Sequence, residues 1–507
     1  MRTTLARAAL ATLSAMAGAA IAAPDAIKDA LDGEKFGLMP ASAFRQATGA
    51  CKDCPTVRQG LWYFRDDLLA VPREKNTAAP LVWLGSPLLL EGATLDAAGQ
   101  LHAPGGAPAD FKLAGKIGTN RSYWNSATTA WFAQRPLRLR GSLDASGAFV
   151  ARTVWPQDFT LQPSPAQPLG ANGLQDFVRK GGGAYATRVI WERQPGQSQT
   201  WADKPVIGIM LNGAQGDDDE AFGGHFAIAT GSVGPQGGWS NWLVNNFYNL
   251  DSVSEKGIIA APVPMDNYLM DLNSGQQFYR PSTMLVAVLS HPRTAAAYQQ
   301  RIGQVFERFY RHDFTYRHAA ANCAGISVDA LRDLGWNVPL RGPTSRVKAL
   351  GGYALFAAKD LSLHSGRKTY DYLTEEQVRL YPAVAFDALG NDLLALASGK
   401  PQRTLTEFER QLAGDVEALV LVNIPQVPSS RAMGSAPVYS IDEFMARTPP
   451  DRADWKIVPT APRPFPAELA EATSRPDETP FPVPLPVGGI AVAGLAGAGA
   501  FWRRRRK

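Results

Sequence analysis

One cysteine in the second half of the chain stands where a nucleophile could be placed. Cys323 follows Asn322, a residue type that often caps helices, and Ile326 and Leu331 lie on the apolar stripe of the helix predicted to start there. Gly335 is positioned to end that helix. Free amide groups and a partial positive charge at a helix N-terminus favour a thiolate. The pattern therefore predicts either a nucleophile or a buried thiol that merely fills the core.

A nucleophilic cysteine needs a general base, and His225 is the strongest candidate among the six histidines. It lies in Gly-Gly-His-Phe-Ala-Ile-Ala-Thr-Gly, where it would begin an apolar strand after glycines that allow close approach. The alternative is a core histidine bonded to a carbonyl. A third polar group should hold the imidazole in one tautomer. The next predicted strand offers Asn241 and Asn245 on one face and Asn246 on the other.

Two other groups of residues could bind a metal ion. His312, His318 and Cys323 could supply nitrogen and sulfur ligands for zinc, but their spacing matches no familiar zinc pattern. The acidic run Asp217 to Glu220 could bind calcium, or it could form a solvated loop. We see no phosphate loop, dinucleotide fingerprint or nucleophile elbow. We therefore predict no metal and no other cofactor.

The elements that would position these residues fall into two folded regions. Residues 59–161 contain short β-rich runs between turn residues, which predicts a small antiparallel β domain. Residues 174–425 begin with strand candidates and continue with helical patterns, which indicates an α+β domain. The helices expected there cover 294–310, the segment from Cys323, 374–380 and 404–421. Residues 23–58 form an N-terminal segment in which residues 25–48 are predicted to form short helical pieces.

Both ends of the chain have the features of export and membrane attachment. In residues 1–22 two arginines precede an apolar run, and Ala20-Ile-Ala22 suits signal peptidase. At the other end, a proline-rich stalk over 426–486 leads into a C-terminal membrane segment over 487–507 with a basic end. We expect an exported body, periplasmic or on the outer surface, tethered to the membrane by its C-terminus.

Export changes the charge and cysteine arguments. The two terminal segments hold seven of the 51 basic residues and no acid, so the remaining 44 basic residues face 46 acidic ones. This balance gives no reason to expect nucleic acid as a partner. Cys51 and Cys54 would form a local disulfide in an oxidising compartment, which leaves Cys323 unpaired.

The C-terminal tail resembles the sorting signals of Gram-negative bacteria that combine a Val-Pro-x-Pro motif, an apolar helix and an arginine cluster. The motif is Val483-Pro484-Leu485-Pro486, and the resemblance covers about 25 residues. It implies an exosortase-type membrane enzyme as a partner, whereas Gly488-Gly489 is similar to a related signal that a rhombosortase, a rhomboid-type protease, reads. A plain membrane anchor is the alternative.

The candidate site resembles that of circularly permuted papain-like proteins, such as the permuted NlpC-type hydrolases and the lecithin retinol acyltransferase group. The order is a strand histidine, a polar residue on the next strand, and an Asn-Cys pair that opens a helix after the aromatic, basic stretch FERFYRHDFTYRHAAANC. The resemblance covers roughly residues 180–340 and is strongest to bacterial envelope proteins of that superfamily. It implies that Cys323 is the nucleophile, His225 the general base, and Asn241 or Asn245 the orienting residue, where many relatives use histidine. Asn322 would cap the helix beside the oxyanion site.

Together these features predict an exported thiol hydrolase or acyltransferase of the cell envelope. It would act on an amide or ester bond of a peptide or acyl substrate through an acyl-enzyme. Cell-wall peptides are the first substrate class to consider, by analogy of fold alone. The alternative is a surface-anchored binding or structural protein that retains the fold without catalysis.

Overall fold

A computed structural model describes most of the central part of the 507-residue chain. The described residues are 36–40, 68–72, 83–85, 88–105, 111–114, 124–133, 135–170, 173–216, 222–249, 258–272, 274–310, 316–429 and 432–455. Several sequence predictions fall outside these ranges: the signal peptide, the Cys51–Cys54 disulfide, the acidic run 217–220, His312, the sorting motif and the C-terminal membrane segment. Within the described ranges, no helix combines the length and apolar character needed to span a bilayer.

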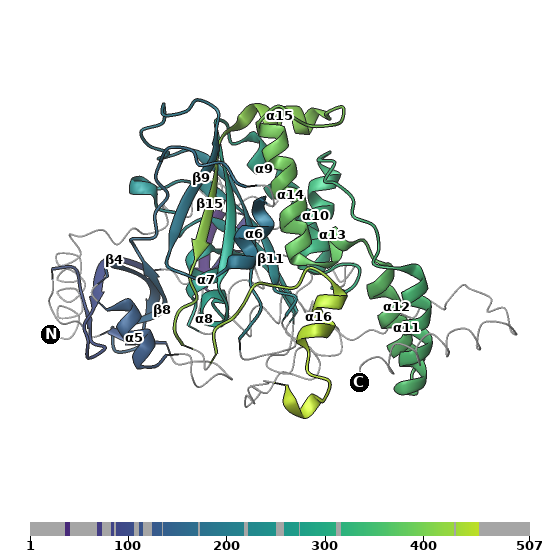
Figure 1. Ribbon diagram of the computed structural model, residues 1–507. Coiled ribbons are helices and arrows are strands. Elements are labelled where there is room, and N and C mark those ends of the chain that lie inside the picture. Colours follow the sequence, from purple (N-terminus) through teal and green to yellow (C-terminus); the bar gives the residue numbers. More distant parts are fainter. Residues whose placement is uncertain are drawn as a thin grey trace, which may run out of the picture.

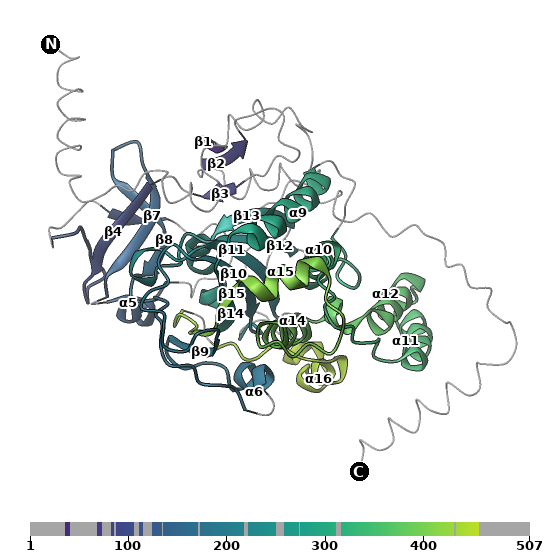
Figure 2. The ribbon, with the colours of Figure 1, turned by 90° about the horizontal axis from the view of Figure 1, so that it is seen from above.

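The described strands form three sheets (Figure 1, Figure 2). A three-stranded sheet has the order β1-β2-β3, with strands Phe36–Pro40, Leu68–Pro72 and Trp83–Gly85. A five-stranded, nearly closed sheet has the order β5-β4-β7-β8-β6, with strands Leu101–His102, Leu88–Leu95, Leu137–Leu143, Phe149–Pro156 and Phe111–Leu113. An antiparallel seven-stranded sheet has the order β13-β12-β11-β10-β14-β15-β9, with strands Ile258–Pro264, Leu243–Asn249, His225–Ser232, Pro205–Asn212, Ser282–Leu289, Val416–Ile424 and Ala186–Glu192.

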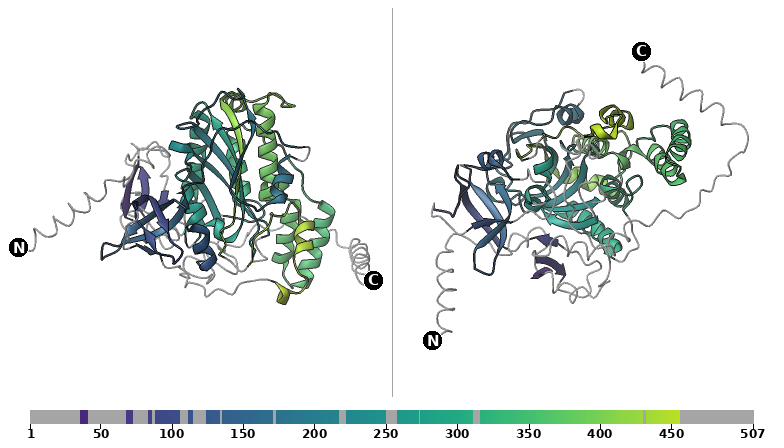
Figure 3. Two further views of the ribbon diagram at one scale, coloured as in Figure 1. Left: turned by 60° about the vertical axis from the view of Figure 1, so that its left-hand side comes forward. Right: turned by 90° about the horizontal axis from the view of Figure 1, so that it is seen from below.

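Helices accompany the two larger sheets. The α-helices are α5 (Ser126–Phe132), α6 (Gly173–Lys180), α7 (Met265–Met270), α8 (Gln276–Tyr279), α9 (Arg293–Tyr310), α10 (Cys323–Asp333), α11 (Arg346–Lys359), α12 (Leu363–Thr374), α13 (Gln377–Leu380), α14 (Pro382–Ala397), α15 (Glu407–Asp415) and α16 (Ile441–Arg447). Short 3-10 turns cover Pro235–Gly237 and Arg452–Asp454. Helices α9, α10 and α14 lie against the seven-stranded sheet, whereas α11 and α12 form a hairpin that projects from the body (Figure 1, Figure 3). The predicted α+β class is confirmed.

The seven-stranded sheet holds the main core because its central strands are covered on both faces. Val286, Ala287 and Val288 are consecutive residues of β14 and all are fully buried. Successive residues of a strand point to opposite faces, so neither face of β14 meets solvent there. The predicted helix over 294–310 is confirmed as α9, whose Tyr298 and Phe306 are buried.

Buried ion pairs join the five-stranded sheet to helix α7 and to the residue that follows it. Arg140 on β7 lies 2.8 Å from Asp266 on α7, and Arg152 on β8 lies 2.8 Å from Asp271, which follows α7. The two aspartates are fully buried. Figure 1 shows the five-stranded sheet beside the seven-stranded one, and these pairs fix that contact.

The structure differs from the sequence predictions in several details. Strand β6 pairs with β8 in parallel, although the sequence predicts an antiparallel β domain there. The helix predicted over 374–380 is interrupted, because α12 ends at Thr374 and α13 begins at Gln377. The 404–421 helix ends at Asp415, because the apolar run Val416–Ile424 pairs between β14 and β9 as strand β15. A short apolar run of this kind does not distinguish a buried strand from a helix. Within 25–48, the described residues Phe36–Pro40 form a strand instead of a helical piece, and they pair with β2. Val427 and Tyr439 are buried, so the folded body continues into the predicted stalk.

Candidate active site around Cys323 and His225

Cys323 is the first residue of helix α10, as the sequence predicts. The Asn322 side chain caps the helix, because its Oδ1 accepts a hydrogen bond of 2.8 Å from the Gly325 amide. Its Nδ2 donates to the carbonyls of His318 at 2.8 Å and Leu380 at 2.9 Å. With the amide committed in this way, Asn322 positions the cysteine and leaves oxyanion binding to other groups.

Polar hydrogens surround the Cys323 sulfur although the residue is only 5% exposed. The Phe226 amide, the Tyr316 hydroxyl and the Ala324 amide all favour the thiolate form. Burial disfavours it more strongly, so the pKa of the Cys323 thiol is raised above its ordinary value. The Cys323 amide also donates to the Tyr316 hydroxyl at 3.3 Å. At neutral pH the cysteine is therefore a protonated thiol.

His225 is the first residue of β11 and lies 3% exposed. Its Nε2 is 2.9 Å from Oδ1 of Asn246. An amide oxygen can only accept, so the neutral ring carries its proton on Nε2 and its lone pair on Nδ1. Burial, with a smaller contribution from the Arg280 charge, lowers the pKa of His225 to about 3. The imidazole is thus neutral over the physiological range.

The two predicted residues begin elements that pack against each other. Helix α10 packs on β11, and the Phe226 amide that contacts the Cys323 sulfur belongs to the residue directly after His225. Arg280 acts electrostatically on both side chains. The structure therefore places the Cys323 sulfur beside the backbone that carries the His225 ring.

The asparagine that contacts His225 is Asn246, whereas the sequence favoured Asn241 or Asn245. That expectation is wrong because the antiparallel register pairs Ile228 with Asn245. Residues opposite each other share a face, so Asn245 lies on the face of Ile228 and Asn246 on the other face. His225 comes three residues before Ile228 on β11, so it also lies on that other face, with Asn246.

The two predicted asparagines have other partners. Asn245 exchanges two hydrogen bonds of 2.9 Å with Gln299 on α9. Asn241 accepts a 3.0 Å hydrogen bond from Arg140 at the contact between the two larger sheets. Neither position is needed to explain the orientation of the His225 ring.

Further polar residues near His225 were not predicted from the sequence. On the neighbouring strand β10, Asn212 stands opposite His225, donates to Ser282 Oγ at 2.8 Å and accepts from the Tyr268 hydroxyl. The Tyr268 ring lies 6.1 Å from the His225 ring, centroid to centroid. No spacing in the sequence marks these residues, because they come from separate strands and a short helix.

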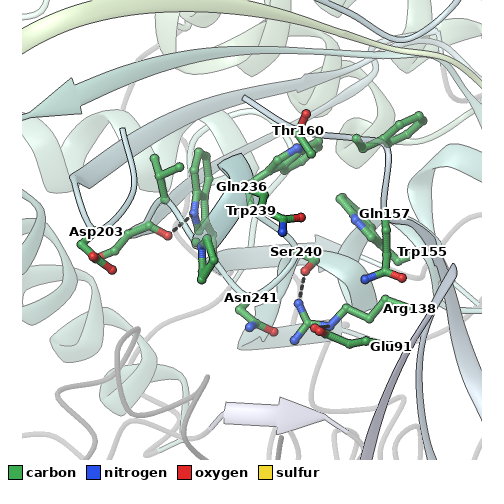
Figure 4. Close-up of a pocket in the computed structure, with 17 residues that line it drawn as sticks. Glu91, Arg138, Trp155, Gln157, Thr160, Asp203, Gln236, Trp239, Ser240 and Asn241 are labelled. Atoms are coloured by element: carbon green, nitrogen blue, oxygen red, sulfur yellow. Dashed lines mark hydrogen bonds and ion pairs between the residues drawn. The ribbon is translucent and has the colours of Figure 1, made fainter. Parts of the chain in front are cut away.

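A cavity of about 390 Å³ lies elsewhere, between the five-stranded sheet and the seven-stranded sheet (Figure 4). Arg138 and Glu91 line one side, while Trp239 and Asn241 line another. Ser232, at the opposite end of β11 from His225, also lines it. The cavity is therefore separate from the Cys323 site, and Asn241 belongs to it.

The zinc alternative gains no support from the described residues. They contain no group of three histidine, cysteine or acidic side chains arranged to hold a metal ion. His318 instead packs edge-on against the Tyr316 ring, with centroids 5.4 Å apart.

Comparison with known proteins identifies no relative. No protein-family model matches the chain, no curated protein is significantly similar to it, and no solved structure matches it.

Proposed function

We propose that the protein is a thiol hydrolase or acyltransferase of the permuted papain-like kind, with Cys323 as nucleophile and His225 as general base. The observation that carries the proposal is the hydrogen bond from His225 Nε2 to Asn246. It leaves Nδ1 as the basic nitrogen of a ring that is fixed next to the residue contacting the Cys323 sulfur. A nucleophile, a base and a group that orients the base are the minimum set for this chemistry.

The reaction starts from a neutral pair. As the sulfur attacks the carbonyl carbon of an amide or ester, the thiol proton moves to His225 Nδ1. The tetrahedral intermediate then expels the amine or alcohol, which takes that proton, and a thioester on Cys323 remains. Water or another acceptor, deprotonated by His225, attacks the thioester and restores the thiol. No thiolate or imidazolium forms before the carbonyl group of the substrate is bound.

The oxyanion of the intermediate would be held by the Cys323 amide and the Tyr316 hydroxyl. These two groups already meet at 3.3 Å, so an oxygen entering between them would find two donors. Burial raises the pKa of Tyr316 well above its ordinary value, so the hydroxyl keeps its proton and can donate.

The sequence patterns at the two ends support an envelope substrate. We propose that the body is exported, stays tethered by its C-terminus until a sorting enzyme acts on the tail, and uses a peptide or acyl substrate of the envelope. This part of the proposal rests on residues 1–22 and 483–507, which lie outside the described residues.

Labelling with a thiol-reactive acyl probe tests the chemistry. Wild type should label at Cys323, Cys323→Ser should not, and His225→Ala should label at least about a hundredfold more slowly, since general-base catalysis contributes that much. Asn246→Ala should slow labelling, whereas the neighbouring Asn245→Ala, which removes an amide from the opposite face, is the matched control. Equal labelling of wild type and His225→Ala would overturn the proposal.

The cavity beside Trp239 favours a second candidate, a surface protein that binds a small ligand between the two larger sheets. The cavity has polar and apolar walls and a buried arginine, Arg138, that pairs with Glu91. If Cys323 does not label in wild type or in His225→Ala, this candidate is favoured over the first.

A further inference from the structure

Buried arginines in the described residues are paired with carboxylates, with one exception. Arg138 lies 3.3 Å from Glu91, Arg140 lies 2.8 Å from Asp266, and Arg152 lies 2.8 Å from Asp271. The fourth buried arginine, Arg280, is 2% exposed and has no carboxylate at ion-pair distance among the described residues. Proteins rarely bury a charge without such a partner, because desolvation costs several kcal/mol.

The Arg280 guanidinium uses little of its hydrogen-bonding capacity. Its Nη1 donates to the Gly213 carbonyl at 3.2 Å, and its Nε is buried without any acceptor. A guanidinium offers donors in a fixed fork that suits the two oxygens of a carboxylate. The unused donor therefore points to an anion that the described residues do not supply.

Arg280 lies at the same end of the sheet as the candidate dyad. It comes two residues before Ser282, which begins β14 and pairs with Asn212, and Asn212 in turn pairs with His225. The Gly213 carbonyl that it binds is close to Gly224, since a Cβ on Gly224 would lie 3.5 Å from that oxygen. The positive charge acts electrostatically on both His225 and Cys323.

We propose that Arg280 binds a carboxylate of the substrate beside the bond that Cys323 attacks. This inference rests on the proposed function and narrows it to amides or esters that carry a carboxylate close to the scissile carbonyl. It gives the guanidinium the carboxylate partner that no described residue provides, and it places the negative charge outside the reacting atoms. Arg280 is a substrate-binding residue in this scheme and takes no proton.

Two alkylating agents with the same reacting carbon test the inference. Iodoacetate carries a carboxylate beside the carbon that the thiol attacks, and iodoacetamide carries a neutral amide. Rates are measured on the Cys323 peptide by mass spectrometry, and the same thiol in urea-unfolded protein gives the reference ratio. Folded wild type should prefer iodoacetate over that reference by about tenfold, the value expected for a charged hydrogen bond.

Variants assign this preference to Arg280. Arg280→Gln should lose it, Arg280→Lys should keep part of it because the charge remains without the fork, and Arg346→Gln, an exposed position with the same change in net charge, should keep all of it. Acetate should slow iodoacetamide labelling of wild type but not of Arg280→Gln. Protection by inorganic phosphate without protection by acetate would overturn the carboxylate assignment.

The possible outcomes distinguish the carboxylate site at Arg280 from the proposed Cys323–His225 dyad. If labelling by iodoacetamide depends on His225 but the iodoacetate preference is the same in wild type and Arg280→Gln, the carboxylate site is refuted and the dyad stands. If labelling is independent of His225, the dyad itself is refuted. Thermal unfolding gives a further readout: Arg280→Met should raise the melting temperature, because it removes a buried charge that has no carboxylate partner among the described residues. A lower melting temperature would show that the guanidinium has a structural partner instead.

Discussion

Protonation of His225 should make the protein lose stability in mild acid. The imidazole has a pKa of about 3 in the folded protein because it is buried and near the Arg280 charge. In the unfolded chain a histidine has a pKa of about 6.5. Between these two values the unfolded state binds the proton and the folded state does not, so the free energy of unfolding falls as the pH falls.

The size of the effect follows from the two pKa values. Between pH 6.5 and 3, each pH unit removes about 1.4 kcal/mol of stability. From pH 7.5 to pH 4.5 the loss from this one histidine should be about 2.5 kcal/mol, since the first unit lies above the unfolded pKa. Other groups also titrate in this range, so the prediction concerns the difference between wild type and His225→Gln, which cannot take up this proton.

Urea unfolding at pH 7.5, 5.5 and 4.5 measures that difference. The gap in the free energy of unfolding between wild type and His225→Gln should change in favour of the variant by about 1.5 kcal/mol at pH 5.5 and by about 2.5 kcal/mol at pH 4.5. His364→Gln provides the matched control, because it makes the same change at an exposed histidine on the projecting hairpin. Parallel curves for wild type and His225→Gln would refute the reasoning. They would mean that the ring ionises in the folded protein as readily as in the unfolded chain, as in a thiolate–imidazolium pair.

Three further predictions concern the framework of the site and are read by urea or thermal unfolding. Gly224→Ala should cost at least about 2 kcal/mol, because φ is +73° and the new Cβ would lie 2.4 Å from the Asn212 carbonyl oxygen. A change below about 0.5 kcal/mol, the size of an ordinary surface effect, would contradict it. Arg140→Met should cost about 3–5 kcal/mol by leaving Asp266 buried and unpaired, and adding Asp266→Leu should recover most of that loss. Asn322→Ala should cost about 2 kcal/mol through loss of the cap, and an unchanged midpoint would show that α10 begins without it.

Local features of the site could be predicted because short-range physics determines them. The Asn322 cap, the start of α10 at Cys323 and the positive φ of +97° at Gly335 depend on residues within one helix. The strand that begins at His225 is likewise marked by its own apolar run. None of these features depends on residues that are distant in the sequence.

Features that depend on pairing between strands could not be predicted in the same way. Alternation along β12 separates Asn245 from Asn246, but only the register against β11 shows which of them faces His225. Strand β15 was mistaken for helix because its burial is decided by its neighbours β14 and β9. Arg280 gave no signal in the sequence, since what distinguishes it is that no described carboxylate lies at ion-pair distance in the folded protein.

The buried arginine and the low basicity of His225 have a common consequence for the proposed mechanism. A base with a pKa of about 3 accepts a proton poorly, and the Arg280 charge is one of the causes of that low value. A substrate carboxylate on Arg280 would offset this charge and so raise the pKa of His225. The base would then become effective when the correct substrate is bound, and the thiol would stay protonated and less reactive in its absence. Carboxylate recognition and activation of Cys323 would thus be the same electrostatic event.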